Sequence, residues 1–292
     1  MKKIYIFLFL LCIQKIIIAQ ELFVLTEPAS NMAAKSIGVR AMNSFMNELD
    51  GSGINYHLMP EVMWGINKKW MVHAQGFISN RNTKLVTEGG SLYAKYRFLS
   101  NDDVHSHFRM STYARLSTNN TDIHQEEIET MGHNSGYELG LIATQLLHKV
   151  AISASVSYEK AMDNSSVNKF PTLQANNAIN YTLSVGKLML PKEYTNYNQT
   201  NINLMLELLG QRLSNGKSFL DMAPSVQFII KSQARIDFGY RYQLYNNMLR
   251  TAPNGFILKL EYTFFNVFKK TIGHRSQTCF RVTVSSRAVS IN

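Results

Sequence analysis

Past residue 35, the chain divides into about a dozen short segments in which apolar and polar residues alternate. In residues 234–245, Ile236, Phe238 and Tyr240 fall on one face, whereas charged residues such as Arg235 fall on the other. A period of two predicts a β-strand with one apolar and one polar side. Charges repeated along one face of such long strands are unusual for a soluble core. They are typical of a membrane barrel, in which lipid covers the apolar face and a wet lumen takes the charges.

This pattern predicts an all-β fold, a transmembrane antiparallel up-and-down β-barrel of about twelve strands. Most of the segments are long enough for a tilted strand to cross a bilayer. An even number of strands is expected for a single-chain bacterial barrel, and it places both chain ends on the periplasmic side. The predicted strands cover residues 36–46, 55–64, 69–79, 90–99, 107–117, 136–147, 149–160, 178–188, 201–211, 219–230, 234–245 and 255–266.

The connections between these segments are alternately short and long, as in outer-membrane barrels. Short links include 65–69 and 147–149, and long polar links include 119–135 and 162–177. The link at 190–200 breaks the alternation, because it should be short and is not. A soluble β-sandwich or a lipocalin-like barrel is the rival fold, since it has the same period with the apolar face turned inward.

The N-terminus predicts export. Met1-Lys-Lys precedes an apolar run from Ile4 to Ile13, and Ala19 stands before a suitable cleavage point. We therefore expect residues 1–19 to be a secretory signal peptide, which leaves Gln20 as the mature start. The apolar run is shorter than the roughly 20 residues that a membrane-spanning helix needs.

The net charge of +10 is distributed unevenly. Three of the excess positive charges belong to Lys2, Lys3 and Lys15 of the signal, and five belong to residues 269–292. Only two remain for residues 20–268, so the charge does not indicate a nucleic-acid partner. Once Cys12 is removed with the signal, Cys279 is the one cysteine left, which excludes an intrachain disulfide.

The signal ending in Ala19-Gln20-Glu21, the amphipathic segments and the terminal strand Phe256–Phe265 resemble outer-membrane β-barrel proteins of the Bacteroidetes type. The resemblance is architectural, covers most of the mature chain and identifies no substrate. It implies a porin-like or transporter-like barrel over residues 36–268 and a partner in the barrel-assembly machinery, which reads a terminal aromatic residue. Phe268 would be that residue, yet residues 269–292 follow it. We expect them to form a poorly ordered basic tail, although residues 279–285 could add a strand.

The polar faces supply the candidate lumen. The residues expected to line it are Lys95, Arg97, Arg109, Arg115, Glu138, Glu159, Glu207, Arg235, Asp237, Arg241, Lys259 and Glu261. Such residues can set the charge preference of an open channel, or they can close the lumen by pairing with one another. Twelve strands do not decide between these alternatives. Residues 20–35 are expected to form a periplasmic lead, with a plug inside the lumen as the alternative.

Other candidate chemistry is weak. His105 and His107 share a strand face, and His124 and His133 lie in one long loop, but no compact ligand set accompanies them. The acidic residues at 126–129 are expected to form a solvated extracellular loop. Ser214-Asn215-Gly216 is better interpreted as a hairpin turn than as part of a catalytic triad. We therefore predict no metal, no cofactor and no catalytic residue.

Passive transport of small solutes through a narrow, charge-lined lumen in the outer membrane is the function that these patterns favour. The alternative is a closed structural or surface-interaction barrel that acts through its long loops. An outer-membrane lipid hydrolase resembling a phospholipase is the third hypothesis. The sequence predicts contact with outer-membrane lipid and identifies no particular solute.

Overall fold

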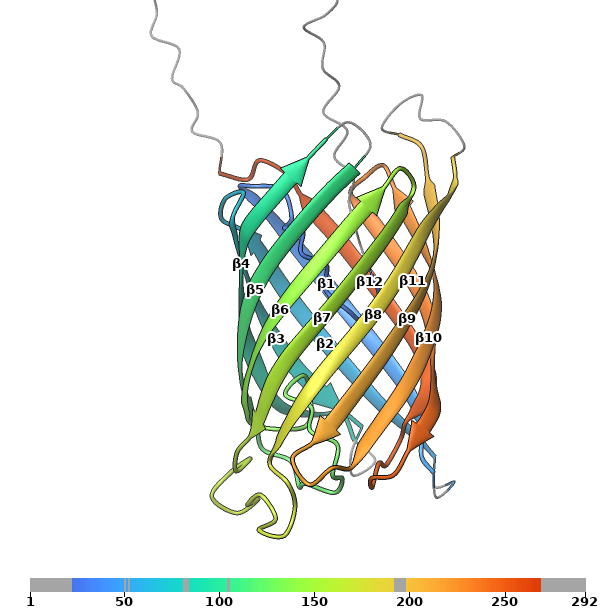
Figure 1. The fold of residues 1–292 in the computed structure, drawn as a ribbon. Coiled ribbons are helices and arrows are strands. Elements are labelled where there is room, and N and C mark those ends of the chain that lie inside the picture. Colours follow the sequence, from blue (N-terminus) through green and yellow to red (C-terminus); the bar gives the residue numbers. More distant parts are fainter. Residues whose placement is uncertain are drawn as a thin grey trace, which may run out of the picture.

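A computed structural model describes residues 23–49, 51, 53–80, 84–103, 106–191 and 198–268 of the chain. The predicted signal peptide and the basic tail lie outside the described residues. The described chain forms a closed barrel of antiparallel strands (Figure 1). The strands are β1 (Ser36–Asn47), β2 (Ile54–Gly65), β3 (Trp70–Ser79), β4 (Val86–Asp102), β5 (Ser106–Asn119), β6 (Gly136–Leu147), β7 (Val150–Ala161), β8 (Asn177–Leu190), β9 (Asn201–Leu213), β10 (Ser218–Ile230), β11 (Ala234–Asn246) and β12 (Asn254–Phe264). No helix among these residues is long and apolar enough to cross a membrane.

Each strand pairs with its neighbours in the chain, and β1 pairs with β12 to close the barrel. The predicted fold class and its twelve strands are therefore confirmed. The largest difference in length is at β4, which was expected over 90–99. It extends further because it stays paired with β5 as far as Asp102, opposite His107. A register shift between Arg97 and Leu99 lets this longer ladder continue.

The two ends of the barrel differ. The short connections, such as that between β6 and β7, lie at the end where β1 begins and β12 ends (Figure 1). The link from β8 to β9, which broke the predicted alternation, lies at this end too, and its residues 192–197 are outside the described part. At the opposite end, residues 162–176 extend beyond the barrel (Figure 1).

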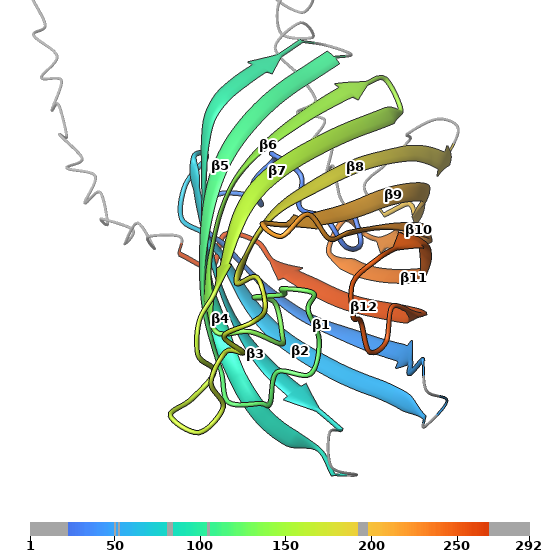
Figure 2. The ribbon, with the colours of Figure 1, turned by 60° about the horizontal axis from the view of Figure 1, so that its bottom comes forward.

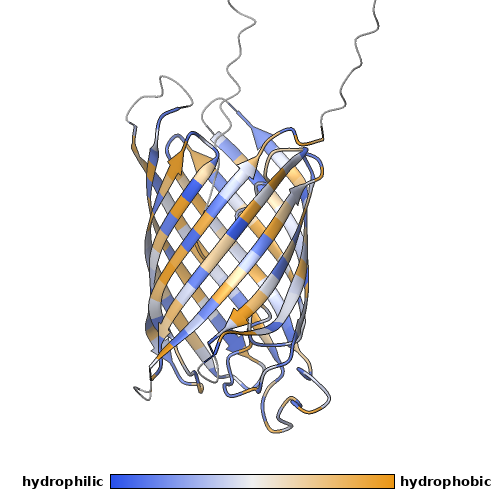
Figure 3. Cartoon of the chain, turned by 180° about the vertical axis from the view of Figure 1, so that it is seen from behind, coloured by the Kyte–Doolittle hydropathy of each residue, from blue (hydrophilic) through white to orange (hydrophobic). Residues whose placement is uncertain are grey.

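The outer surface of the barrel is apolar. Val39, Val62, Leu92 and Leu116 are about half exposed or more, and hydrophobic and polar residues alternate along much of the strands that face the viewer in Figure 3. Charged residues are buried instead, for example Lys95, Glu207 and Asp237. A soluble barrel would have the reverse arrangement, so the outer surface suits lipid.

Aromatic side chains stand near both ends of this surface. At the short-connection end, the rings of Trp64 and Phe268 are 5.7 Å apart. At the long-loop end, Phe45 is opposite both Tyr56 and Phe256 in the sheet, and its ring is 5.0 Å from that of Tyr56. Aromatic residues in these positions are typical of the two interfaces of a bilayer.

Candidate functional site: the barrel lumen

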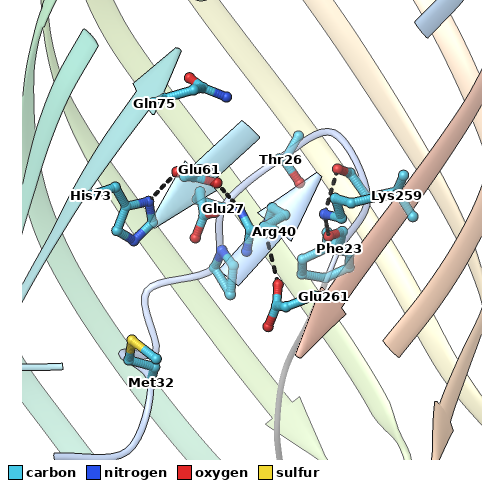
Figure 4. A network of polar contacts seen from close by, with 12 residues as sticks. Phe23, Thr26, Glu27, Met32, Arg40, Glu61, His73, Gln75, Lys259 and Glu261 are labelled. Carbon is cyan, nitrogen blue, oxygen red and sulfur yellow. Dashed lines mark hydrogen bonds and ion pairs between the residues drawn. The ribbon is translucent and has the colours of Figure 1, made fainter. Parts of the chain in front are cut away.

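Charged residues on neighbouring strands lie opposite one another inside the barrel. Arg40 on β1 faces Glu61 on β2 and Glu261 on β12 in the sheet register. Its guanidinium contacts both carboxylates, at 3.0 Å and 2.8 Å (Figure 4). Glu61 also accepts His73 Nδ1 at 2.6 Å, and Arg235 Nη2 lies 2.6 Å from Glu261. Opposite charges at facing positions of adjacent strands stabilise the sheet and compensate each other inside the lumen.

The N-terminal segment, residues 23–35, lies inside the lumen. Glu207 on β9 is fully buried and accepts the backbone N–H groups of Val24, Leu25 and Thr26 at 2.7–3.1 Å. Lys259 Nζ donates to the carbonyls of Phe23 and Val24, at 2.8 Å and 2.7 Å (Figure 4). We call residues 23–35 the plug segment. The preferred expectation of a periplasmic lead does not describe these residues, because buried side chains satisfy their backbone groups within the barrel.

Residues 28–30 of the plug segment are also held by side chains of the barrel wall. Lys95 on β4 donates to the carbonyls of Pro28 and Ser30, at 2.7 Å and 2.9 Å, and Ala29 N donates to Thr144 Oγ1 at 2.9 Å. Phe23 and Val24 add apolar packing against a cluster on the lumen wall. This cluster consists of Met42, Met59, Phe77, Met205 and Ile257. The lumen wall is thus part polar and part apolar, and both parts bind the plug segment.

The loop between β5 and β6, residues 120–135, covers much of the mouth of the barrel at the long-loop end (Figure 2). It turns inward across the opening (Figure 2). Ile128 exchanges two backbone hydrogen bonds with the side chain of Gln211, and Thr130 N donates to Glu159 at 2.6 Å. We call residues 120–135 the lumen loop.

Its acidic residues are not solvated as expected. Glu127 is 7% exposed and contacts Arg250 at 2.7 Å and Arg241 at 3.0 Å. Burial alone would raise the pKa of the Glu127 carboxyl, but these two guanidinium groups lower it below its ordinary value. Burial, together with the neighbouring charge of Glu127, raises the pKa of Glu129 to about 7. The expectation that residues 126–129 form a solvated loop was wrong for Glu127, because Arg241 and Arg250 bind its carboxylate at the mouth of the barrel.

A cavity of about 250 Å³ lies between the plug segment and the lumen loop. A second cavity, of about 450 Å³, lies at the rim of the long-loop end. The two cavities share four lining residues: Asn55, Gln125, His133 and Thr251. The inner cavity, which we call the chamber, is therefore adjacent to the outer one across a neck formed by these side chains.

The structure places the predicted lumen residues in two groups and leaves several apart. Arg235, Asp237, Lys259 and Glu261 join the network around Arg40. Arg115, Glu138 and Glu159 lie side by side on β5, β6 and β7. Among the remaining residues, Lys95 and Glu207 bind the plug segment, Arg241 binds the lumen loop, and Arg109 contacts Asp102 at 2.8 Å near the short-connection end. Arg97 is half-buried opposite the buried Ser111.

Sequence reasoning missed several central charges. Arg40 and Glu61 lie on predicted strands, and the alternation in 36–46 and 55–64 would have placed each on a polar face. Asp221 on β10 could have been found in the same way. Glu27 and Arg250 gave no such signal, because they lie in segments without periodicity. Only the folded barrel brings Arg250 to Asp221, at 2.7 Å.

The other candidate chemistry is dispersed. His107 pairs with Asp102 at 3.0 Å, and His133 pairs with Glu129 at 3.3 Å, whereas His105 lies outside the described part. Within that part, no group of three or more potential ligands is arranged to hold a metal ion. Ser214 is exposed in the tight turn between β9 and β10, where Gly216 has a φ of 89°.

Comparison with known proteins identifies the fold and no more. No family model matches the chain, and no curated protein matches it. An outer-membrane channel from Pseudomonas putida F1 is 11% identical over 82% of this chain and 98% of its own, with a TM-score of 0.51. The NanC porin is 11% identical over 77% of this chain and 98% of its own, with a TM-score of 0.46. The KdgM porin is 10% identical over 78% and 99%, with a TM-score of 0.44. The likeness to the first bears on the fold alone, which is a closed barrel of antiparallel strands.

Proposed function

We propose that the protein passes small polar solutes through the outer membrane by diffusion along its lumen. The observation that carries this proposal is the chamber, which is lined by charged residues of both signs and adjoins a cavity open at the rim. The plug segment forms a constriction on the side of the chamber that faces the short-connection end. It is held there by hydrogen bonds and packing, so it can shift without breaking a covalent bond. The Pseudomonas protein of similar fold is an outer-membrane channel, which agrees with this function.

The surroundings of the barrel follow from the same proposal. Residues 1–19 direct export, both chain ends are periplasmic, and the apolar outer face contacts outer-membrane lipid. The assembly machinery reads Phe268, as the Bacteroidetes-type resemblance implies.

Conductance across planar bilayers tests the function. Full-length mature protein should give small, discrete current steps, and deletion of residues 23–34 should enlarge them because it removes the constriction. A deletion of residues 269–292 is the control and should leave the steps unchanged. Folded protein that never conducts, with or without residues 23–34, would refute transport.

A closed barrel that interacts through its surface is the second candidate. It is favoured by the occupation of the lumen from both ends and by the loop at 162–176, where Val167 is 85% and Leu173 is 99% exposed. Replacing both residues with serine would abolish binding of a surface partner while the conductance steps stay as they are. Loss of a binding activity on whole cells, with no conductance in bilayers, would establish this second function in place of the first.

A further inference from the structure

We propose that the chamber binds a small, neutral, polyhydroxylated solute of about monosaccharide size, on a wall formed by His73, Tyr93 and Arg115. This inference rests on the proposed function, because it names the class of solute that the lumen would pass. It depends on the buried hydrogen-bonding atoms of the chamber wall that have no hydrogen-bond partner, on the pairing of its charges and on its aromatic surface.

The three residues lie side by side in the sheet. His73 on β3 is opposite Tyr93 on β4, and Tyr93 is opposite Arg115 on β5. The ring centroids of His73 and Tyr93 are 4.9 Å apart, and the Arg115 guanidinium lies 5.4 Å from the centre of the Tyr93 ring. All three residues line the chamber. The row therefore presents one continuous surface toward the space between the plug segment and the lumen loop.

Each of these residues has a buried polar atom without a hydrogen-bond partner in the folded chain. The atoms are Nε2 of His73, the hydroxyl of Tyr93 and Nε of Arg115. His73 and Tyr93 are each only 5% exposed. His73 Nδ1 lies 2.6 Å from the Glu61 carboxylate, which leaves Nε2 as the second hydrogen-bonding atom of the ring. Arg115 Nε lies 3.6 Å from Glu138 Oε2, beyond hydrogen-bond distance, and is a donor, whereas the tyrosine hydroxyl is both donor and acceptor. Hydroxyl groups satisfy such a set, because each one donates and accepts.

Most of the charges that line the chamber have a partner of opposite sign, and Glu159, which has none among the described residues, accepts hydrogen bonds from Thr130 N and Asn180 Nδ2, each at 2.6 Å. Arg40 has three carboxylate partners, and Arg241 lies between Glu127 and Asp221. Glu138 lies 3.6 Å from Arg115 and accepts the hydroxyls of Tyr113 and Ser157, at 2.6 Å and 2.7 Å. A solute with a net charge would leave that charge without a counterion in a confined space. A neutral solute avoids the free-energy cost of this unpaired charge.

The aromatic surface and the volume narrow the class further. Tyr93 and Tyr113 have ring centroids 5.3 Å apart and offer apolar faces beside the polar atoms. The C–H faces of a sugar or a cyclic polyol suit such a surface, and its hydroxyl rim suits the open atoms. The chamber, at about 250 Å³, is smaller than the roughly 300–1,000 Å³ of a typical ligand pocket, so a single small ring fits better than a longer chain.

Saturation-transfer NMR on the full-length mature protein in detergent tests this site, with D-glucose as the probe. Glucose should bind saturably, and more tightly than either D-glucuronate or D-glucosamine. Tyr93→Phe keeps the ring and removes the hydroxyl, so it should weaken glucose binding about two- to tenfold, as expected for one hydrogen bond. Tyr262→Phe, the same change on the outward face, is the matched control and should have no effect.

Arg115→Lys provides a second variant, because it keeps the positive charge but withdraws the Nε donor. It should weaken glucose binding to a similar extent. Three results would overturn the proposal: no saturable binding of glucose, tighter binding of glucuronate, or unchanged glucose binding in both folded variants. If glucose does not bind while the protein conducts in bilayers, the transport function stands and only the neutral-solute site is refuted.

Discussion

Arg40 Nε donates a hydrogen bond to Glu261 Oε2 at 2.8 Å, across the seam where β1 meets β12 and the barrel closes. The same guanidinium contacts Glu61 on β2 and Glu27 of the plug segment, each at 3.0 Å. One cation thus links the first, second and last strands with the segment inside them. Removing it leaves three carboxylates close together without their shared partner.

We predict that Arg40→Met lowers the free energy of unfolding by about 3–5 kcal/mol, the usual consequence of removing one member of a buried ion pair. Urea titration in detergent, followed by the heat-dependent shift in gel mobility, measures the change. Lys169→Met is the control, because Lys169 and Asp163 form an exposed pair at 2.9 Å that should not matter for stability. Equal urea midpoints of unfolding for the two variants would show that the stability of the β1–β12 seam does not depend on Arg40.

Glu207 should determine whether the plug segment stays in place. Glu207→Leu leaves three buried backbone N–H groups without an acceptor, each at a cost of about 1–3 kcal/mol. The plug segment should then leave its site, and the bilayer current per channel should increase. Glu207→Gln keeps one acceptor oxygen and should give a smaller increase. Currents that match the unaltered protein in both variants would mean that the plug segment is held elsewhere.

The lumen loop should become less tightly bound as the pH rises. The pKa of Glu129 is about 7 in the folded loop, above the ordinary value of a glutamate, so the folded loop holds the proton more strongly than a released loop does. Its stabilisation is complete below the ordinary glutamate range and is lost as the pH rises toward 7. Hydrogen exchange at the amides of Ile128 and Thr130, corrected for the intrinsic pH effect, should therefore increase over this range. Glu129→Gln should remove the dependence, and a profile identical in both proteins would contradict the assignment.

Arg250 should hold the lumen loop in its inward position. It is buried between Glu127 and Asp221, at 2.7 Å from each, and its guanidinium lies 3.9 Å from the centre of the Phe219 ring. Arg250→Met should favour opening of the lumen loop by about 3–5 kcal/mol, because both carboxylates lose a buried partner. Faster amide exchange confined to residues 125–131 is the expected result. Lys217→Met, at the partly exposed pair with Glu126, should change exchange far less.

The strands could be predicted because each carries its own local signal. A residue such as Ile236 or Asp237 shows its face by its distance from the next apolar residue, and lipid and lumen reinforce that alternation. The same parity is the basis on which the lumen residues were predicted. The same rule would have included Arg40 and Glu61 had it been applied to the first two strands.

What fills the lumen could not be predicted in this way. The plug segment has no periodicity, and its position depends on Glu207, Lys95 and Lys259, which lie far away in sequence. The lumen loop was misjudged because a run of acidic residues ordinarily seeks water. Its partner Arg250 lies in another loop and becomes visible only when β11 and β12 bring it to the mouth. Long-range pairing of charges between irregular segments leaves no pattern in a single sequence.

The inward turn of residues 120–135 leaves the protruding loop at 162–176 as the most prominent feature of its end of the molecule. Leu173 is 99% exposed there, whereas Ile128 is 2% exposed within the mouth. An antibody or another bulky reagent that approaches from this side will meet the protruding loop and will not reach the buried Glu127 of the lumen loop. Variation in residues 166–174 could therefore change how the molecule is recognised from outside without altering what its lumen admits.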